Sequence, residues 1–426
     1  MKTLKSITTF LMALLIAATL PSDLFSQLKK DKIQYFRPYD RTGANTFEMS
    51  TQTDVKFDGI QILWGGAFRQ QWQTLNHSND PFIVDGVVAN ELPELGPGFN
   101  TANANLYLDI QLADGVKVNV ATYLSSRHHP EAWVKGGYLQ IDDLKMLNSP
   151  FVDNLMKNLR VKVGQYELNY GDQHFRRSDN AQGIYNPFVG NYIMDPFTTE
   201  IGGEIQYLNN GFIGVLSLMS GELRGNVSDE QFRDPSFSGK IGYDNRSVDG
   251  FRYRLTGSFY HTNRSANNTL YFGDRAGSHY HGIMDNSDFS GRLNPGLRSK
   301  VTSFMINPFF KYRGFEFFGT YETTDGRAAN EIDDRNFEQW AAEGIYRFLP
   351  NEQVYLGMRF NRVTGEMANG ADIRINRFNF AGGWFITDSV LLKAEYVIQD
   401  YDRFPANTIF NGAKFEGLIL EGVVAF

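Results

Sequence analysis

The stretch KFEGLILEGVVAF, residues 414–426, ends the chain and decides the fold that the sequence predicts. Successive side chains of a β-strand point to opposite faces, so an alternating stretch has two faces of different character. One face here is apolar and ends on an aromatic ring, with Leu418, Leu420, Val424 and Phe426. The opposite face carries Glu421 beside small and aliphatic residues. A strand of this kind suits a wall between lipid and water, as in a β-barrel that crosses a membrane.

The first residues of the chain agree with this fold. Lys2 and Lys5 precede an apolar run at residues 10–20, which Pro21 and short polar residues follow. This order is typical of a secretory signal peptide, which we place at residues 1–26. The run is too short for a membrane anchor, and no later stretch approaches the roughly 18 uninterrupted apolar residues of a spanning helix. The sequence therefore favours a membrane protein built from strands over one built from helices.

Composition narrows the function classes. The chain has no cysteine, which excludes disulfides, a lipid-modified N-terminal cysteine and cysteine chemistry. Its formal net charge is -7, or -8 once the net +1 of residues 1–26 is removed, so no basic domain indicates a nucleic-acid partner. The 41 glycines and 14% aromatic residues favour many strands joined by glycine turns. We expect no cofactor.

Alternating segments fill most of the chain. They occupy residues 59–75, 103–112, 116–125, 133–141, 159–169, 199–208, 212–220, 237–244, 251–261, 302–312, 315–322, 337–348, 353–363, 373–386, 390–399 and 415–426. An even number of strands is what a single-chain barrel needs when both ends of the chain lie on one side. The predicted fold is an all-β transmembrane antiparallel up-and-down barrel of about 16 strands, with about 14 or 18 as alternatives. We assign residues 59–426 to it.

The lengths of the connections support the barrel. Short connections follow even-numbered strands, at residues 114–115, 209–211, 245–250, 313–314, 349–352 and 387–388. Long ones follow odd-numbered strands, at residues 76–102, 170–198, 221–236 and 262–301. Short periplasmic turns and long extracellular loops are typical of outer-membrane barrels, whereas a soluble β-sandwich has no reason to sort its loops this way. The exception, residues 142–158, is predicted as a short amphipathic helix on the short-turn side.

Aromatic residues gather near the short connections, for example Tyr207, Tyr243, Tyr346 and Trp384. Their rings have an apolar body and a polar tip, which suits the headgroup level of a bilayer. The alternative is that they are core aromatics of a soluble sheet.

Three motifs carry a resemblance to a known family. They are IQYFRPYDRTGANT at residues 33–46, Phe57-Asp58-Gly59 before the first strand, and GQYELNYGDQHFRRSDN at residues 164–180. The chain resembles the porin-type outer-membrane barrels of the Bacteroidota and, more distantly, the phosphate-selective porin O and P family. The resemblance implies a 16-stranded channel with an inward-folded third extracellular loop. The loops here depart from the phosphate-selective members in having no obvious Lys/Arg ladder, so the resemblance does not imply phosphate selectivity.

Function then depends on the lumen, because a 16-stranded barrel is too wide for its own side chains to fill. Alternation turns both signs of charge inward. The expected cations are Lys117, Arg160, Lys162, Lys240, Arg252, Arg254, Lys311, Arg347, Arg359, Arg377 and Lys393. The expected anions are Asp109, Glu200, Glu204, Asp244, Glu316, Glu322, Glu343, Glu395 and Glu421. Of these, Arg252, Arg254, Lys311, Arg359, Glu204 and Glu343 are our pore candidates.

The third extracellular loop, residues 170–198, is the candidate for a constriction. It carries His174, Arg176 and Arg177 beside Asp172, Asp179 and Asp195. Opposite charges facing each other across an eyelet would filter solutes by size and dipole. The alternative is that these charges pair with one another on the outer surface. If Arg176 and Arg177 point inward with Arg252 and Arg254, a modest anion preference follows.

The sequence predicts an outer-membrane porin, a passive or weakly selective channel for small hydrophilic solutes or anions, with membrane lipid as its other partner. The alternative is a plugged barrel that serves as a scaffold, an adhesin or part of a larger envelope complex, since residues 27–58 form a polar periplasmic segment that either plugs the mouth or docks a partner. A homotrimer stays open as an assembly.

Catalytic and metal functions are the weaker alternatives. A barrel hydrolase would need a set such as His174, Ser178 and Asp179, but no Gly-x-Ser-x-Gly, His-Glu-x-x-His or P-loop motif is present. We therefore expect no enzyme. The seven histidines lie on the long-loop side, at His77, His128, His129, His174, His261, His279 and His281. Solvent exposure explains them more simply than metal binding, so no metal site is assigned.

Overall fold

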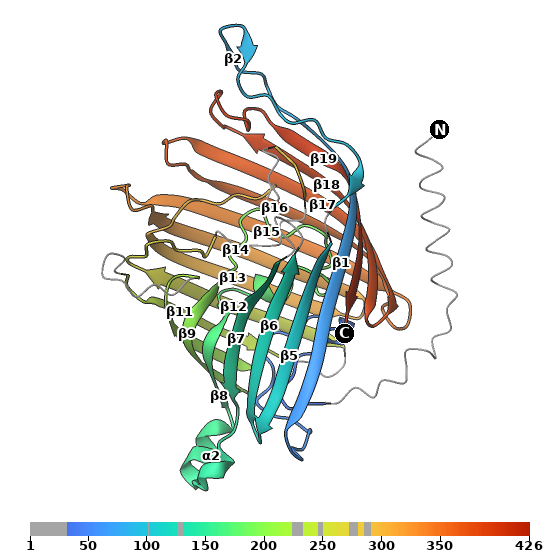
Figure 1. Cartoon of the computed structure of the whole chain (residues 1–426), viewed down its shortest axis with the longest axis vertical. Coiled ribbons are helices and arrows are strands. Elements are labelled where there is room, and N and C mark those ends of the chain that lie inside the picture. The colour runs from blue at the N-terminus through green and yellow to red at the C-terminus, as the bar shows by residue number, and fades with distance from the viewer. Residues whose placement is uncertain are drawn as a thin grey trace.

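The computed structural model of the chain describes residues 32–100, 102–125, 131–223, 233–245, 250–271, 280–284 and 291–426. Within these residues sixteen antiparallel strands close into one barrel, as predicted (Figure 1). They are β1 (Gln61–Ser78), β5 (Asn103–Ala113), β6 (Val116–Ser125), β7 (Glu131–Ile141), β8 (Leu159–Glu167), β9 (Thr199–Asn209), β10 (Phe212–Met219), β11 (Ser236–Asp244), β12 (Phe251–Thr262), β13 (Lys300–Tyr312), β14 (Phe315–Arg327), β15 (Arg335–Phe348), β16 (Val354–Glu366), β17 (Asp372–Thr387), β18 (Val390–Asp402) and β19 (Lys414–Ala425). The short β2 (Ile83–Val84), β3 (Val87–Val88) and β4 (Gly98–Phe99) lie in the connection between β1 and β5. The predicted signal peptide, residues 1–26, lies outside the described residues.

β1 closes the barrel because its two halves have different neighbours. Residues 61–69 pair with β5, and residues 67–78 pair with β19. The last residue continues this seam, since the backbone N–H and C=O of Phe426 both bond to Gly66 at 3.0 Å. A closed barrel leaves no edge with unpaired backbone groups, which is the condition for a sheet to lie in hydrocarbon.

The outward side chains of the strands are largely apolar and the inward ones largely polar. Outside, Ile241 is 74% exposed, whereas inside Arg254 is 1% exposed and Glu395 0%. At the end of the chain the same contrast separates Phe426, which follows β19 and is 54% exposed, from Glu421 of β19, which is 2% exposed. A water-soluble sheet has the reverse arrangement, so this wall matches lipid outside and polar groups inside.

The two rims of the barrel differ, as predicted. At the short-turn rim, two-residue turns join β5 to β6, β9 to β10, β13 to β14 and β17 to β18. In the β9–β10 turn Asn210 and Gly211 have φ of 49° and 89°, the type I′ backbone that these two residues adopt with least strain. The long-loop rim carries the longer connections, including residues 168–198 and 263–299.

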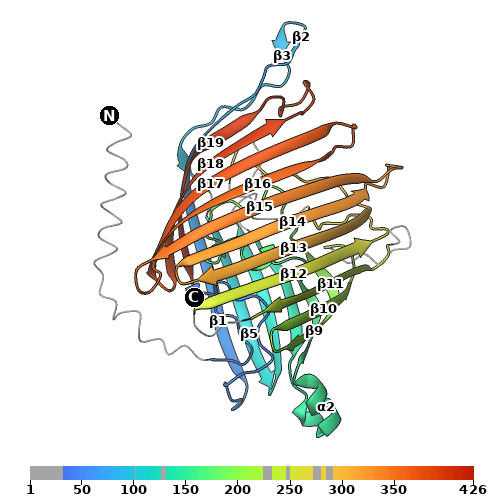
Figure 2. The ribbon, with the colours of Figure 1, turned by 180° about the vertical axis from the view of Figure 1, so that it is seen from behind.

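The predicted helix of the short-turn rim is α2 (Pro150–Met156), which projects away from the barrel (Figures 1 and 2). The Ser149 hydroxyl accepts from the N–H of Val152 at 3.5 Å, and proline at the first helical position has no N–H to leave unpaired. No helix among the described residues is long and apolar enough to cross a membrane.

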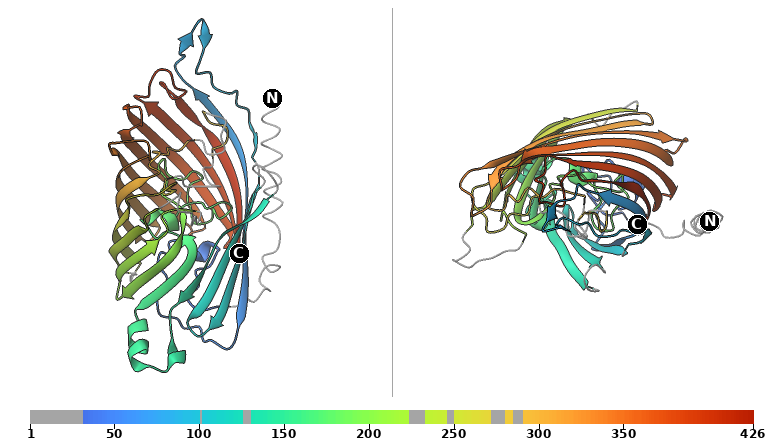
Figure 3. Two further views of the ribbon diagram at one scale, coloured as in Figure 1. Left: turned by 60° about the vertical axis from the view of Figure 1, so that its left-hand side comes forward. Right: turned by 90° about the horizontal axis from the view of Figure 1, so that it is seen from above.

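Long connections and the N-terminal residues lie inside the wall of strands, as the view from above shows (Figure 3, right). Their apolar side chains pack against inward residues of the wall toward the long-loop rim. This cluster includes Val189, Ile193, Leu270, Tyr280 and Leu293 from the connections and Phe337, Val363 and Ile419 from the wall. The lumen is therefore partly filled by the chain itself.

Candidate functional site

The connection between β8 and β9, residues 168–198, folds into the lumen, and we call it the internal loop. Wall side chains hold its backbone at several points. The N–H of Ile193 donates to the Asn361 side chain of β16 at 2.7 Å. The N–H of Val189 donates to the Glu395 carboxylate of β18 at 2.8 Å. Inward polar side chains of the wall thus accept the hydrogen bonds that water would otherwise accept from the loop backbone.

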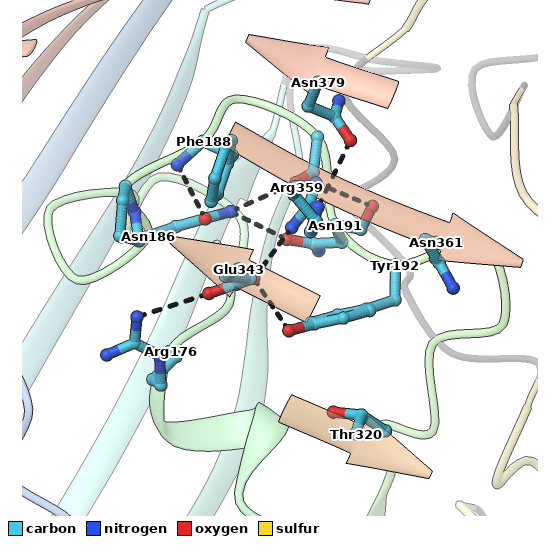
Figure 4. Close-up of polar contacts among 12 residues, drawn as sticks. Arg176, Asn186, Phe188, Asn191, Tyr192, Thr320, Glu343, Arg359, Asn361 and Asn379 are labelled. Atoms are coloured by element: carbon cyan, nitrogen blue, oxygen red, sulfur yellow. Dashed lines mark hydrogen bonds and ion pairs between the residues drawn. The ribbon is translucent and has the colours of Figure 1, made fainter. Parts of the chain in front are cut away.

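Glu343 of β15 is the centre of one ion-pair cluster (Figure 4). Its carboxylate lies 3.3 Å from Arg176 of the internal loop and 3.4 Å from Arg359 of β16. It also accepts from the Tyr192 hydroxyl at 2.7 Å. Arg176 has a second acid partner, Glu316 of β14, at 2.8 Å. Three of the pore candidates therefore meet here, and with Glu316 the two arginines face two acids.

Asp172 is the centre of a second cluster, which joins three parts of the chain. Its carboxylate lies 2.7 Å from Arg254 of β12 and 2.9 Å from Lys240 of β11. Glu48, from the residues before β1, lies 2.7 Å from Arg254 and 3.1 Å from Lys240. All four side chains are buried. Two acids and two bases therefore fasten the internal loop and the N-terminal residues to the wall.

The surroundings of Asp172, Glu48 and His174 set the protonation states of these three side chains. Burial raises the pKa of Asp172, but the charges of Arg254 and Lys240 outweigh burial and hold that pKa below its usual range. The same opposition lowers the pKa of Glu48 to about 2. Burial, and then the charge of Lys240, lower the pKa of His174 well below its usual value. At neutral pH both acids are charged and His174 is neutral.

Arg177 and its neighbours form a third group on the internal loop. The guanidinium lies 2.7 Å from Asp195 and 3.6 Å from Asp179, and its central carbon is 3.8 Å from the centre of the Phe197 ring. Asp179 also pairs with Lys135 of β7. The remaining predicted residues are partnered too, in the pairs Arg252–Asp244 at 2.6 Å, Lys311–Glu352 at 2.5 Å and Glu204–Gln206 at 2.5 Å.

The residues before β1 lie in the lumen, and we call residues 32–58 the N-terminal segment. The Tyr39 hydroxyl donates to Asp109 of β5 at 2.7 Å, and the Tyr39 ring stacks on Tyr107 with 4.0 Å between centroids. The N–H of Gln34 donates to the Gln111 side chain at 3.0 Å. The sequence left a plug and a tail as alternatives, because a polar segment with a few aromatic residues is compatible with both.

A cavity of about 240 Å³ lies between the N-terminal segment, the internal loop and the wall from β5 to β9. Its lining is aromatic and charged, and includes Tyr39, Tyr107, Tyr138, Tyr166, Arg37, Lys117, Lys162 and Asp109. The sequence predicted inward positions for Lys117, Lys162 and Asp109. It gave no signal that Arg37 and the tyrosines would join them, because that depends on where the N-terminal segment folds.

Neither alternative site of the sequence analysis is assembled among the residues that the structure describes. No cluster of three or more metal-binding side chains occurs in the described part of the chain, and His128, His129 and His279 lie outside it. Among the described residues no hydrogen bond joins His174 to Ser178. The Ser178 hydroxyl accepts from Asn186 at 3.1 Å, and Nδ1 of His174 has no partner.

Comparison with known proteins finds likeness in structure alone. No protein-family model and no curated relative matches the chain. The anion-selective porin from Comamonas acidovorans superposes with a TM-score of 0.53 at 9% identity, over 86% of this chain and 100% of that one. The trimer form of the outer membrane protein OmpT of Vibrio cholerae gives 0.52 at 11% identity, over 87% of this chain and 100% of that one. The outer membrane channel DcaP of Acinetobacter baumannii gives 0.50 at 12% identity, over 88% and 100%.

The chain has a porin-type barrel fold. At these identities the likeness concerns the fold, so the internal loop, the N-terminal segment and the cavity have to be interpreted from this chain's own residues. The resemblance to Bacteroidota barrels and to phosphate-selective porins stays a prediction.

Proposed function

We propose that this chain is an outer-membrane channel through which small hydrophilic solutes or ions diffuse passively, without chemistry, cofactor or metal. In this proposal residues 1–26 direct export, the short-turn rim faces the periplasm and membrane lipid covers the outward face. A homotrimer is one assembly that this fold allows, and a trimer form is known for the Vibrio cholerae barrel.

One observation carries the proposal: polar side chains line the inside of the wall while apolar ones cover the outside. The inward side chains of Arg252 and Lys311, for example, are 24% and 28% exposed although they lie on strands whose outward neighbours face the lipid side. Such a wall is costly in a dry core and favourable around water. The internal loop narrows the space, which favours small solutes over large ones.

Cysteine accessibility tests the proposal, because the natural chain has no cysteine. Asn119 and Val118 are neighbours on β6, but Asn119 is buried and lines the cavity while Val118 is on the outward face. We expect a charged, membrane-impermeant thiol reagent to change the single-channel conductance of Asn119→Cys and to leave Val118→Cys unchanged. The full chain should conduct steadily in a planar bilayer.

The second candidate function is a plugged scaffold, and the buried ion pairs between Glu48 and the wall are the observation that favours it. A barrel that stays closed in the bilayer, with Asn119→Cys unreactive from both sides, would decide for the scaffold and against the channel.

A further inference from the structure

The cavity between the N-terminal segment and the β5–β9 wall has an unbalanced set of charges. Its lining holds the cations Arg37, Lys117, Lys135, Arg160, Lys162 and Arg177, and the anions Glu48, Asp109, Glu167 and Asp179. The cations outnumber the anions by two, and Glu48 is already paired with Arg254 and Lys240. A partly enclosed cavity strengthens such an imbalance, because less solvent screens it than at an open surface.

Three of the six lining cations are neutralised by ion pairs. Lys135 pairs with Glu167 and Asp179. Arg160 lies 2.6 Å from Asp142, a residue behind the lining. Arg177 is likewise balanced by Asp195. These three cations need no further anion.

The other three cations, Arg37, Lys117 and Lys162, have no carboxylate within 4.0 Å among the described residues. Arg37 donates to the backbone carbonyls of Gly43 and Phe175, at 3.0 and 2.9 Å. Lys117 donates to a backbone carbonyl at 2.7 Å. The remaining lining acid, Asp109, accepts only from neutral donors, at 2.7 and 3.0 Å. Three cations and one acid of the lining thus have no ion-pair partner within 4.0 Å among the described residues.

Lys162 is the cation best placed to meet a ligand. Its ammonium nitrogen lies 4.4 Å from the centre of the Tyr138 ring and 4.4 Å from that of the Tyr166 ring. Among the described residues no acceptor forms a hydrogen bond with this ammonium group. Glu204 is its cross-strand neighbour on β9, but it accepts instead from Gln206 at 2.5 Å and from Ser217 at 3.2 Å. Two aromatic faces thus support an ammonium group whose donors stay available.

We propose that this cavity binds a small carboxylate with a flat apolar body, and that Lys162 is its anchor. The ammonium group would bind the carboxylate, while the tyrosine rings of the lining offer apolar faces to the rest of the molecule. Size agrees, since a cavity of about 150 Å³ suffices for benzene and this one measures about 240 Å³. The proposal rests on the proposed channel and names a solute class for it.

The site differs from the one that the sequence suggested for anions. Arg176, Arg177 and Arg254 are all neutralised by acids of the loop, the wall or the N-terminal segment. An anion preference of the channel is therefore assigned to Lys162 and its cavity.

Binding of benzoate to the detergent-refolded chain, measured by saturation-transfer NMR, tests the proposal without requiring conduction. We expect Lys162→Met to weaken benzoate binding about tenfold, because a charge-assisted hydrogen bond is lost. Lys162→Arg should keep binding within about threefold of the natural chain. Lys300→Met is the matched control, because it removes the same charge from a lysine outside the cavity that is already paired with Asp334 at 2.6 Å. It should leave binding unchanged.

Two further ligands sharpen the test. Benzyl alcohol, the neutral analogue, should bind weakly and equally to the natural chain and Lys162→Met. Inorganic phosphate should bind more weakly than benzoate. Equal losses in Lys162→Met and Lys300→Met, or phosphate binding tighter than benzoate, would overturn the proposal. Benzoate binding to a chain that never conducts would keep the site and reject the channel, whereas a conducting chain that does not bind benzoate would do the reverse.

Discussion

At the scale of single residues, Asp172 has the most demanding position in the lumen. Its two oxygens accept from Arg254, Lys240 and the Thr256 hydroxyl at 2.7 to 2.9 Å. Asp172→Asn leaves two buried cations with too little negative charge, so we expect the free energy of unfolding to fall by roughly 3–5 kcal/mol. Urea unfolding of the refolded chain measures the change.

The surface pair of Asp402 and Arg374 provides the control for this change. Asp402 is 44% exposed in its side chain, and exposed pairs contribute at most about 1 kcal/mol. Asp402→Asn should therefore change stability little. Equal effects of the two substitutions would contradict the view that the cluster around Asp172 holds the internal loop.

At the scale of elements, the period of two in the sequence was sufficient to predict where the strands lie. It was not sufficient to predict how the loops fold. Each predicted segment coincides with a strand, and the errors lie at the ends: β14 continues to Arg327 rather than stopping at Glu322. Strands are predictable because lipid on one side and polar groups on the other impose a period of two along each of them. Glu167 shows the limit, since strict alternation would set it on the face of β8 opposite to Arg160 and Lys162, yet it pairs with Lys135 beside an irregularity in the β6–β7 register.

The partners of the internal loop could not be predicted in the same way. Asp172 and Arg176 meet residues more than 60 positions away in the sequence, and no local period encodes such pairs. The residue types were predictable, because charged groups in a lumen need counter-charges. Which acid meets which base depends on how the loop and the N-terminal segment fold together, and this is a property of the whole lumen.

The N-terminal segment allows a prediction at this scale. Glu48 pairs with Arg254 and Lys240, whereas Asp54 of the same segment is exposed. Glu48→Lys would set a third cation against two buried ones, so we expect the segment to leave the lumen and single-channel conductance to rise. Asp54→Lys makes the same charge change without breaking a pair and should conduct like the natural chain. Conductance that rises equally in both variants would assign the effect to net charge instead.

At the scale of the whole molecule, the exposed apolar wall has meaning only if lipid covers it. Ile241, on the outward face of β11, is 74% exposed, and Ile332, in the connection between β14 and β15, is 88% exposed. In water, changing either residue to arginine would cost little. In a bilayer, Ile241→Arg should destabilise the barrel folded in lipid vesicles by about 2–4 kcal/mol, while Ile332→Arg should change its stability by less than about 1 kcal/mol. Folding titrations of the two variants in the same vesicles measure the difference. Equal values would mean that both side chains face water and that the barrel is a soluble body. Only lipid around the wall makes Ile241→Arg costly, because both positions are exposed on the protein itself.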